Sequence, residues 1–272
     1  MPSAKSCIFC GRFDGLSKEH IWPQWMAAYL PVAEPKAHIS EVHSGIPKQP
    51  RVLQRRSERP GPVHTKKVRA VCQRCNNTWM SAIEEQAKPV LLRFLTSSSS
   101  NIDTAEASHL STWAVLKTVV GEHASADHLT PYEDRSKLRT VGELPWYFRV
   151  FAAKHRSLTR TAYVRHSATL SRTLKGPEPP LPRGITRNFQ VTTLLVGPLC
   201  LHVSALRVND VDPALLDPVR PMHRLHPPVG HAVDLGSTLE LGEVDLHLNS
   251  QVVERLMRHP RVKYGGEIPV HQ

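Results

Sequence analysis

The chain has 272 residues, enough to bury a sizeable core in one large domain or two ordinary ones. Its hydrophobic fraction of 40% and charged fraction of 22% are typical of a globular protein. The formal net charge of +11 favours a polyanionic partner, most simply nucleic acid. The longest apolar run, residues 193–203, is too short to span a bilayer, so we expect no membrane association.

The cysteines carry the strongest pattern. The N-terminal segment lacks the apolar core of a secretory signal, so we expect a cytoplasmic protein whose cysteines stay reduced. Four cysteines form two C-x-x-C pairs, Cys7/Cys10 and Cys72/Cys75. This spacing indicates a metal site, and four thiolates match a tetrahedral structural zinc with no open position. Cys200 lies in an apolar run and is expected to be a buried free thiol.

The first cysteine pair is followed by Gly11, as expected for a tight turn that aims both sulfurs at one ion. Residues 22–30 predict a short helix that ends at Pro31. Residues 31–69 contain many prolines and indicate a basic insertion with little regular structure. Several of its side chains are candidate phosphate contacts, with a solvated disordered loop as the alternative. These candidate nucleic-acid-binding residues are Arg51, Arg55, Arg56, Arg59, Lys66, Lys67 and Arg69.

The alternation of residues 67–71 predicts a strand that leads to Cys72. A helix is expected to begin near Cys75, because four apolar residues follow at intervals of four: Trp79, Ile83, Ala87 and Leu91. Pro89 is expected to kink or break this helix.

A four-serine run at residues 97–100 marks the expected boundary between domains at 1–100 and 101–272. Asp103, with Glu106 three residues later, predicts a capped amphipathic helix that runs to about residue 121.

Four strand-like runs and a helix follow in the second domain. Gly197-Pro198 between the last two runs predicts a turn and an antiparallel pairing. The strand-like runs cover residues 146–152, 161–166, 189–196 and 199–208, and helical spacing returns at 248–257. The expected fold class is therefore α+β, with helices packed on a small antiparallel sheet in the second domain.

The chemistry of a hydrolytic centre is present beside the two cysteine pairs. Glu19, His20 and Asn76 each lie on a segment that the zinc would hold. Cleavage of a phosphodiester by water needs a base and a divalent cation that stabilises developing charge. Histidine suits the base near neutral pH, and carboxylate and amide oxygens suit Mg²⁺.

The succession C-x-x-C, Glu-His-Ile-x-Pro and C-x-x-C-Asn resembles the HNH endonuclease family in its four-cysteine, zinc-stabilised form. The resemblance covers roughly residues 5–95 and implies a ββα-metal fold. It implies that His20 is the general base, that Glu19 and Asn76 hold a catalytic Mg²⁺ or Mn²⁺, and that the four paired cysteines bind structural zinc. The family's central Asn is absent, since residues 21–71 contain no Asn.

The sequence thus predicts a metal-dependent endonuclease that acts on nucleic acid, most simply DNA. Two other classes stay open, a zinc-stabilised nucleic-acid-binding protein without catalysis and a protein-interaction adaptor. His223, His226 and His231 lie in a Pro-rich stretch, and are loop histidines or a second metal site.

Overall fold

The structure is a computed structural model of the whole chain. It describes residues 6–13, 15–30, 37–44, 52–60, 66–97, 99–156, 161–172, 181–208, 211, 213–218, 222–237, 241, 248–259 and 262–264. Within these ranges, no helix combines the length and the apolar character that a membrane crossing needs. The fold contains both helices and antiparallel sheets, which confirms the α+β class.

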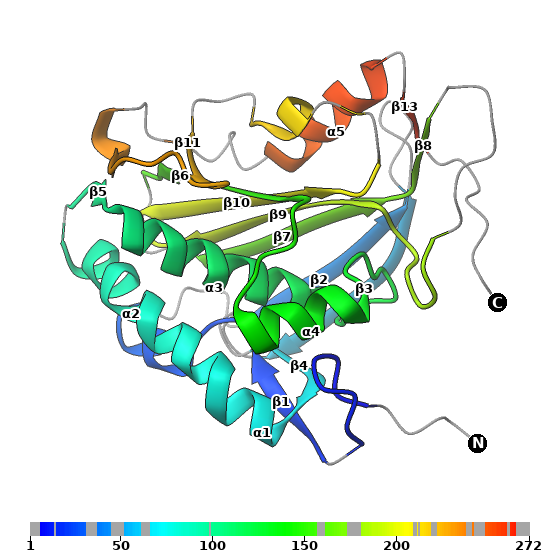
Figure 1. Cartoon of the computed structure of the whole chain (residues 1–272), viewed down its shortest axis with the longest axis horizontal. Helices are drawn as coiled ribbons and strands as arrows, with labels where there is room; N and C mark the ends of the chain where they lie inside the picture. Colours follow the sequence, from blue (N-terminus) through cyan, green and yellow to red (C-terminus); the bar gives the residue numbers. More distant parts are fainter. Residues whose placement is uncertain are drawn as a thin grey trace.

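A five-stranded antiparallel sheet lies at the centre of the fold, with helices on both faces (Figure 1). The spatial order of its strands is β11 (His223–His226), β6 (Phe148–Lys154), β10 (Leu199–Leu206), β9 (Phe189–Val196) and β7 (Thr161–Ala168). Gly197, with a positive φ of 55°, begins the two-residue turn between β9 and β10. The four predicted strands and the antiparallel pairing at this turn are confirmed.

Helices α3 (Thr104–Glu122) and α5 (Leu248–Arg258) cover opposite faces of this sheet (Figure 1). The prediction that α3 is amphipathic was wrong, because every residue from Trp113 to Glu122 is buried. The sheet covers one side of α3 and α2 (Ser81–Thr96) packs on another. This buried part of the helix therefore has no solvent face on which to place its charged residues, Lys117 and Glu122.

The N-terminal part supplies two strands and a long helix. Strand β1 (Leu16–His20) pairs antiparallel with β4 (Lys67–Cys72), and β4 continues into helix α1 (Gln73–Cys75). A π-helical turn over Asn76–Met80 joins α1 to α2. The predicted strand and helix start are confirmed. The short helix predicted before Pro31 is the 3₁₀ turn Gln24–Ala28.

Helix α2 passes through Pro89 to Thr96, so the predicted break does not occur. Proline removes one helical hydrogen bond, the one to the carbonyl of Glu85, and that residue lies on the exposed side of the helix. The opposite side is buried in the core and holds the helix together through Ala87, Val90, Leu91 and Phe94.

The insertion contains a β-hairpin, so the expectation of little regular structure was wrong. Strand β2 (Ala37–Ser44) pairs antiparallel with β3 (Val52–Pro60). The prolines of the insertion lie outside these strands except for Pro60, the last residue of β3, where a missing N–H costs little. Proline therefore marks the ends of the strands.

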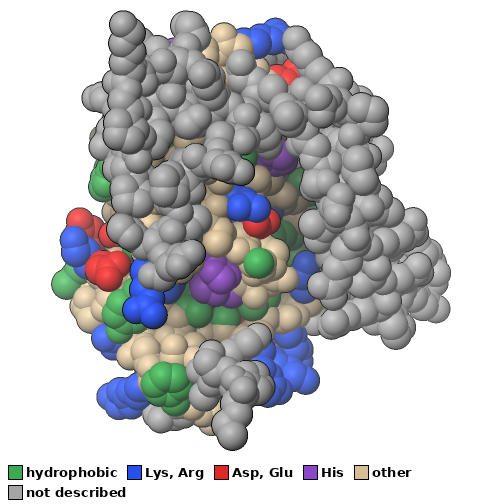
Figure 2. Space-filling model, turned by 90° about the vertical axis from the view of Figure 1, so that its right-hand side faces the viewer, with side chains coloured by type: hydrophobic (Ala, Val, Ile, Leu, Met, Phe, Trp, Pro, Cys, Tyr) green, Lys and Arg blue, Asp and Glu red, His purple; other side chains and the backbone are tan. Residues whose placement is uncertain are grey.

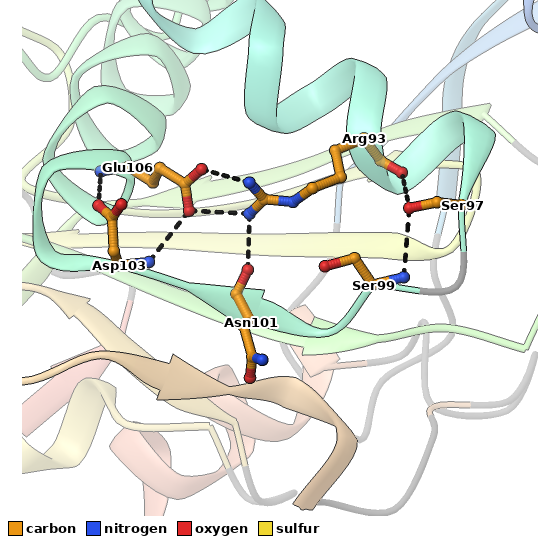
Figure 3. Close-up of polar contacts among 6 residues, drawn as sticks. All are labelled: Arg93, Ser97, Ser99, Asn101, Asp103 and Glu106. Atoms are coloured by element: carbon orange, nitrogen blue, oxygen red, sulfur yellow. Dashed lines mark hydrogen bonds and ion pairs between the residues drawn. The ribbon is translucent and has the colours of Figure 1, made fainter.

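A corner of polar contacts joins α2 to α3 (Figure 3). Asp103 and Glu106 form the predicted capping box, in which each side chain accepts a hydrogen bond from the other residue's backbone N–H. The guanidinium of Arg93 on α2 pairs with the carboxylate of Glu106 and donates to the carbonyl of Asn101 at 2.6 Å. These contacts fix α2 and α3 relative to each other.

The remaining elements are short. Strand β5 (Asn101–Ile102) pairs with β12 (Val233–Asp234), and β8 (Leu170–Arg172) pairs with β13 (Val262–Tyr264). Helix α4 (Tyr132–Val141), which the sequence did not predict, ends at Gly142 in the left-handed region with φ 70°. Two 3₁₀ turns cover Pro213–Leu216 and Leu235–Ser237.

One buried cluster contains residues from both sides of the expected boundary at residue 100. Phe9, Trp22 and Val71 belong to the same core as Trp113 and Phe148. The division into domains at 1–100 and 101–272 stays a prediction, but the two parts share this core.

Buried His202 makes the stability of the fold depend on pH. It lies on β10, with Nδ1 within 3.2 Å of Thr193 Oγ1, and burial lowers its pKa to about 4. An unfolded histidine has a pKa of about 6.5, so the unfolded state binds more protons between about pH 4 and 6.5. The free energy of unfolding should therefore rise with pH across that window.

His202→Gln, which keeps a polar group near Thr193, should reduce this slope by up to about 1.4 kcal/mol per pH unit. Urea unfolding at a series of pH values measures it, with exposed His231→Gln as the control. An unchanged slope in His202→Gln would contradict the assignment.

Candidate metal centre and adjoining cleft

Two turns bring the four paired cysteines together. The Sγ atoms of Cys7, Cys10, Cys72 and Cys75 all lie within 4.8 Å of one another. The Cys10 and Cys72 sulfurs are 3.7 Å apart, and a tetrahedral zinc with Zn–S bonds of about 2.3 Å requires about 3.8 Å. The four side chains could therefore hold a metal ion such as zinc.

Each turn has a backbone geometry that aims its sulfurs inward. The N–H of Gly11 donates to the carbonyl of Cys7 at 2.9 Å, and its φ of 71° shows why glycine follows the first pair. In the second turn, the N–H of Cys75 donates to Cys72 Sγ at 3.5 Å. The N–H of Ile8 donates to the carbonyl of Ala70 at 3.0 Å and ties the first turn to β4.

Cys200 is buried and free, as predicted, and burial raises the pKa of its thiol to about 12. Among the described residues, the four paired cysteines are the one group of three or more potential ligands close enough to hold an ion. The histidines between residues 223 and 231 therefore form no second metal site there.

A cleft of about 480 Å³ adjoins this centre, and Glu19, His20 and Asn76 line it together. The first two end strand β1, and Asn76 begins the π-helical turn after β4. The structure thus brings together the three residues that the sequence selected for the centre, although Glu19 and Asn76 are 57 positions apart in the chain.

The pairing of β1 with β4 sets this arrangement. Leu16 lies opposite Cys72, and His20 lies opposite Lys67. Between them the register shifts by one residue, so that Glu19 lies opposite Val68. A β-bulge of this kind redirects the side chains beyond it, and here they are the two that line the cleft.

The surroundings of His20 favour the neutral form of its imidazole. The Nε2 atom of Gln24 lies 3.3 Å from Nε2 of His20, and because an amide nitrogen only donates, the imidazole nitrogen accepts. Burial lowers the pKa of His20, and the positive charge of Lys67 acts in the same direction. Glu19 opposes these effects but does not outweigh them.

Asn76 is oriented through its amide nitrogen, which donates to Ser17 Oγ at 3.4 Å. Ser17 in turn donates to the carbonyl of Val71 at 3.1 Å. This chain of contacts connects the helix, β1 and β4, and leaves the amide oxygen of Asn76 as the group that can bind a cation.

Glu19 is buried at the floor of the cleft and pairs with Lys117 of α3. The distance from Lys117 Nζ to Glu19 Oε1 is 2.6 Å. The same ammonium lies 3.4 Å from Oε2 of Glu84, which also lines the cleft. Burial raises the pKa of Glu84, and Lys117 partly offsets this effect.

Sequence reasoning missed Glu84 and Lys117. Glu84 could have been found, because Asn76, Met80, Glu84 and Lys88 repeat every four residues and all line the cleft. No local pattern indicates Lys117, which lies 98 positions from Glu19 in the chain.

The candidate phosphate contacts are placed unevenly. Lys66, Lys67 and Arg69 lie on or next to β4, and the last two are exposed. Arg55, Arg56 and Arg59 lie on β3, but their side chains are outside the described residues, as is Arg51 altogether. Figure 2 shows one face of the molecule on which Lys and Arg side chains lie along the lower edge and close to a central histidine.

Comparisons of the chain with protein-family models, curated proteins and solved structures returned no match. The geometry of the centre and the cleft therefore carries the functional argument.

If the four-cysteine centre holds zinc, purified wild-type protein should contain one zinc ion per chain. Cys72→Ser removes a buried ligand from the centre and should abolish stoichiometric zinc and destabilise the fold. Cys200→Ser changes a cysteine outside the centre and should keep the zinc. Metal analysis by mass spectrometry measures all three proteins. Folded, reduced wild type without zinc would contradict the assignment.

Proposed function

We propose that this protein is a metal-dependent endonuclease of the HNH type that hydrolyses phosphodiester bonds in DNA. The observation that carries the proposal is the shared cleft of Glu19, His20 and Asn76 beside the four-cysteine centre. The order of elements adds support, because β1, β4 and the helical segment from α1 to α2 follow the strand–strand–helix pattern of a ββα-metal unit.

The proposed roles follow from the chemistry of each group. His20 takes a proton from water, and its lowered pKa keeps the basic, neutral form available near pH 7. The carboxylate of Glu19 and the amide oxygen of Asn76 would hold Mg²⁺ or Mn²⁺. That cation would neutralise the negative charge that develops on the phosphate.

The charges of the cleft favour a divalent cation. Glu85 pairs with Lys88 at 3.5 Å, so these two charges offset each other. Glu19 and Glu84 share the single ammonium of Lys117, which leaves one negative charge at the floor of the cleft when both are ionised. A cation that enters the cleft compensates this charge.

With Mn²⁺ or Mg²⁺, the zinc-loaded wild type should nick supercoiled plasmid, and His20→Ala should reduce the rate by about 10²- to 10⁴-fold. The matched control is His231→Ala, which removes an exposed histidine outside the cleft and should leave the rate unchanged. Equal rates for wild type and His20→Ala on plasmid, linear and branched DNA would refute the catalytic role.

A second candidate is a zinc-stabilised nucleic-acid-binding protein without catalysis. The specific observation in its favour is the ion pair between Lys117 and Glu19, because a carboxylate already partnered by a buried ammonium has less charge to offer a metal. Binding of DNA without metal-dependent cleavage would support this candidate over the endonuclease.

Both candidates require contact with phosphates near β4. Lys67→Ala and Arg69→Ala should each weaken DNA binding and reduce the slope of log Kd against log salt by about 0.9 for each lost contact. Lys137→Ala, on the exposed side of α4, is the control. Fluorescence anisotropy at several salt concentrations measures the slopes. Binding that does not depend on salt would instead favour a protein-interaction adaptor.

A further inference from the structure

We propose that Lys117 is a positioning residue of this site, which holds Glu19 and the backbone of His20 so that Glu19 and Asn76 can share one divalent cation. This inference rests on the proposed function and adds a residue from α3 to the site in the cleft. Glu19 and His20 lie on β1, nearly 100 positions earlier in the chain.

The contacts of Lys117 match the number of its donors. A lysine ammonium has three N–H groups. Its nitrogen lies 2.6 Å from Glu19 Oε1, 3.0 Å from the carbonyl oxygen of His20 and 3.4 Å from Glu84 Oε2. Three oxygens from β1 and α2 therefore surround one ammonium from α3, and each oxygen restricts how the others can move.

Burial decreases outward from this ammonium. The side chain of Lys117 is 1% exposed, that of Glu19 8% and that of Glu84 25%. Lys117 therefore lies beneath the floor of the cleft, whereas both carboxylates line it. The lysine takes Oε1 of Glu19, which leaves Oε2 as the oxygen that a cation in the cleft could use.

The other buried charge of α3 provides a comparison. Glu122 accepts from the hydroxyl of Thr130 at 2.6 Å, from the amide of Gln190 at 2.7 Å and from two backbone N–H groups at 3.0 Å. None of these partners lines the cleft, so the role of Glu122 is to stabilise the fold and not to shape the cleft. Both carboxylates that contact Lys117 line the cleft, which is the reason to assign that residue to the site.

The cost of burying Lys117 supports the same conclusion. An ion pair removed from water is often no more stable than an apolar pair of similar volume. The fold places the ammonium of Lys117 beneath the cleft although Trp113, Leu116 and Val120, its neighbours on α3, are apolar and buried. An apolar residue would fill that space but would not orient a carboxylate.

The test compares Lys117→Met with Lys137→Met, the same change on the exposed side of α4. Cleavage in Mn²⁺ with DNA in saturating excess gives kcat, anisotropy gives the Kd for DNA, and metal analysis with thermal unfolding confirms that each variant is zinc-loaded and folded. Lys117→Met should lower kcat about 10²-fold with an unchanged Kd, since a displaced catalytic group affects the chemical step rather than DNA binding. A kcat equal to that of wild type in folded Lys117→Met overturns the inference while the proposed function stands.

Loss of the ammonium leaves Glu19 buried without its partner, so Lys117→Met could unfold the protein. Lys117→Gln then replaces it in the test, because its amide still donates to Glu19 and to the carbonyl of His20. Retained folding and zinc with a partial loss of kcat at unchanged Kd supports positioning. If both variants lose their zinc and their folded structure, Lys117 is needed for folding and the inference is overturned.

Binding of Mn²⁺, followed by electron paramagnetic resonance, separates this inference from the proposed function. If wild type cleaves no DNA, the endonuclease proposal fails. The positioning role then survives only if wild type binds Mn²⁺ and Glu19→Gln abolishes that binding. In addition, folded Lys117→Met, or Lys117→Gln in its place, must weaken Mn²⁺ binding about tenfold or more. Absence of Mn²⁺ binding in wild type overturns both.

Discussion

The arrangement of the candidate site depends on the four cysteines that join the first turn of the chain to the start of the long helix. Cys7 and Cys10 lie more than 60 positions before Cys72 and Cys75, yet their sulfurs meet within 4.8 Å. In small zinc peptides such a centre contributes about 10–16 kcal/mol to folding. Beside this centre β1 pairs antiparallel with β4, and the end of β1 and the helical segment that follows β4 line one cleft.

The buried helix α3 connects the cleft beside this centre to the rest of the molecule. It packs on the central sheet and on α2, and the corner at Arg93 and Glu106 fixes its angle to α2. Two charged residues lie within its buried length. Glu122 is satisfied by neutral donors inside the fold, and Lys117 reaches the carboxylates under the cleft. The central five-stranded sheet is thus connected to the cleft through helix α3.

Sequence patterns predicted those features that depend on neighbouring residues. Spacing alone identified the cysteine pairs, the capping box of Asp103 and the four strands, because each is a local signature. The hairpin in the insertion was not predicted, because the prolines around its two strands are also typical of irregular loops. Lys117 could not be predicted, because its role comes from two oxygens of β1 that only tertiary packing brings to it. Glu84 lay within reach of helical spacing from Asn76.

The most direct test of this account is a crystal structure of the zinc-loaded protein soaked in Mn²⁺, with anomalous scattering recorded for each metal. The account predicts a zinc peak among the four Sγ atoms and a manganese peak in the cleft, within about 2.3 Å of oxygens from both Glu19 and Asn76, with Lys117 still paired to Glu19. A cleft without manganese, or manganese bound only away from Glu19 and Asn76, would contradict it.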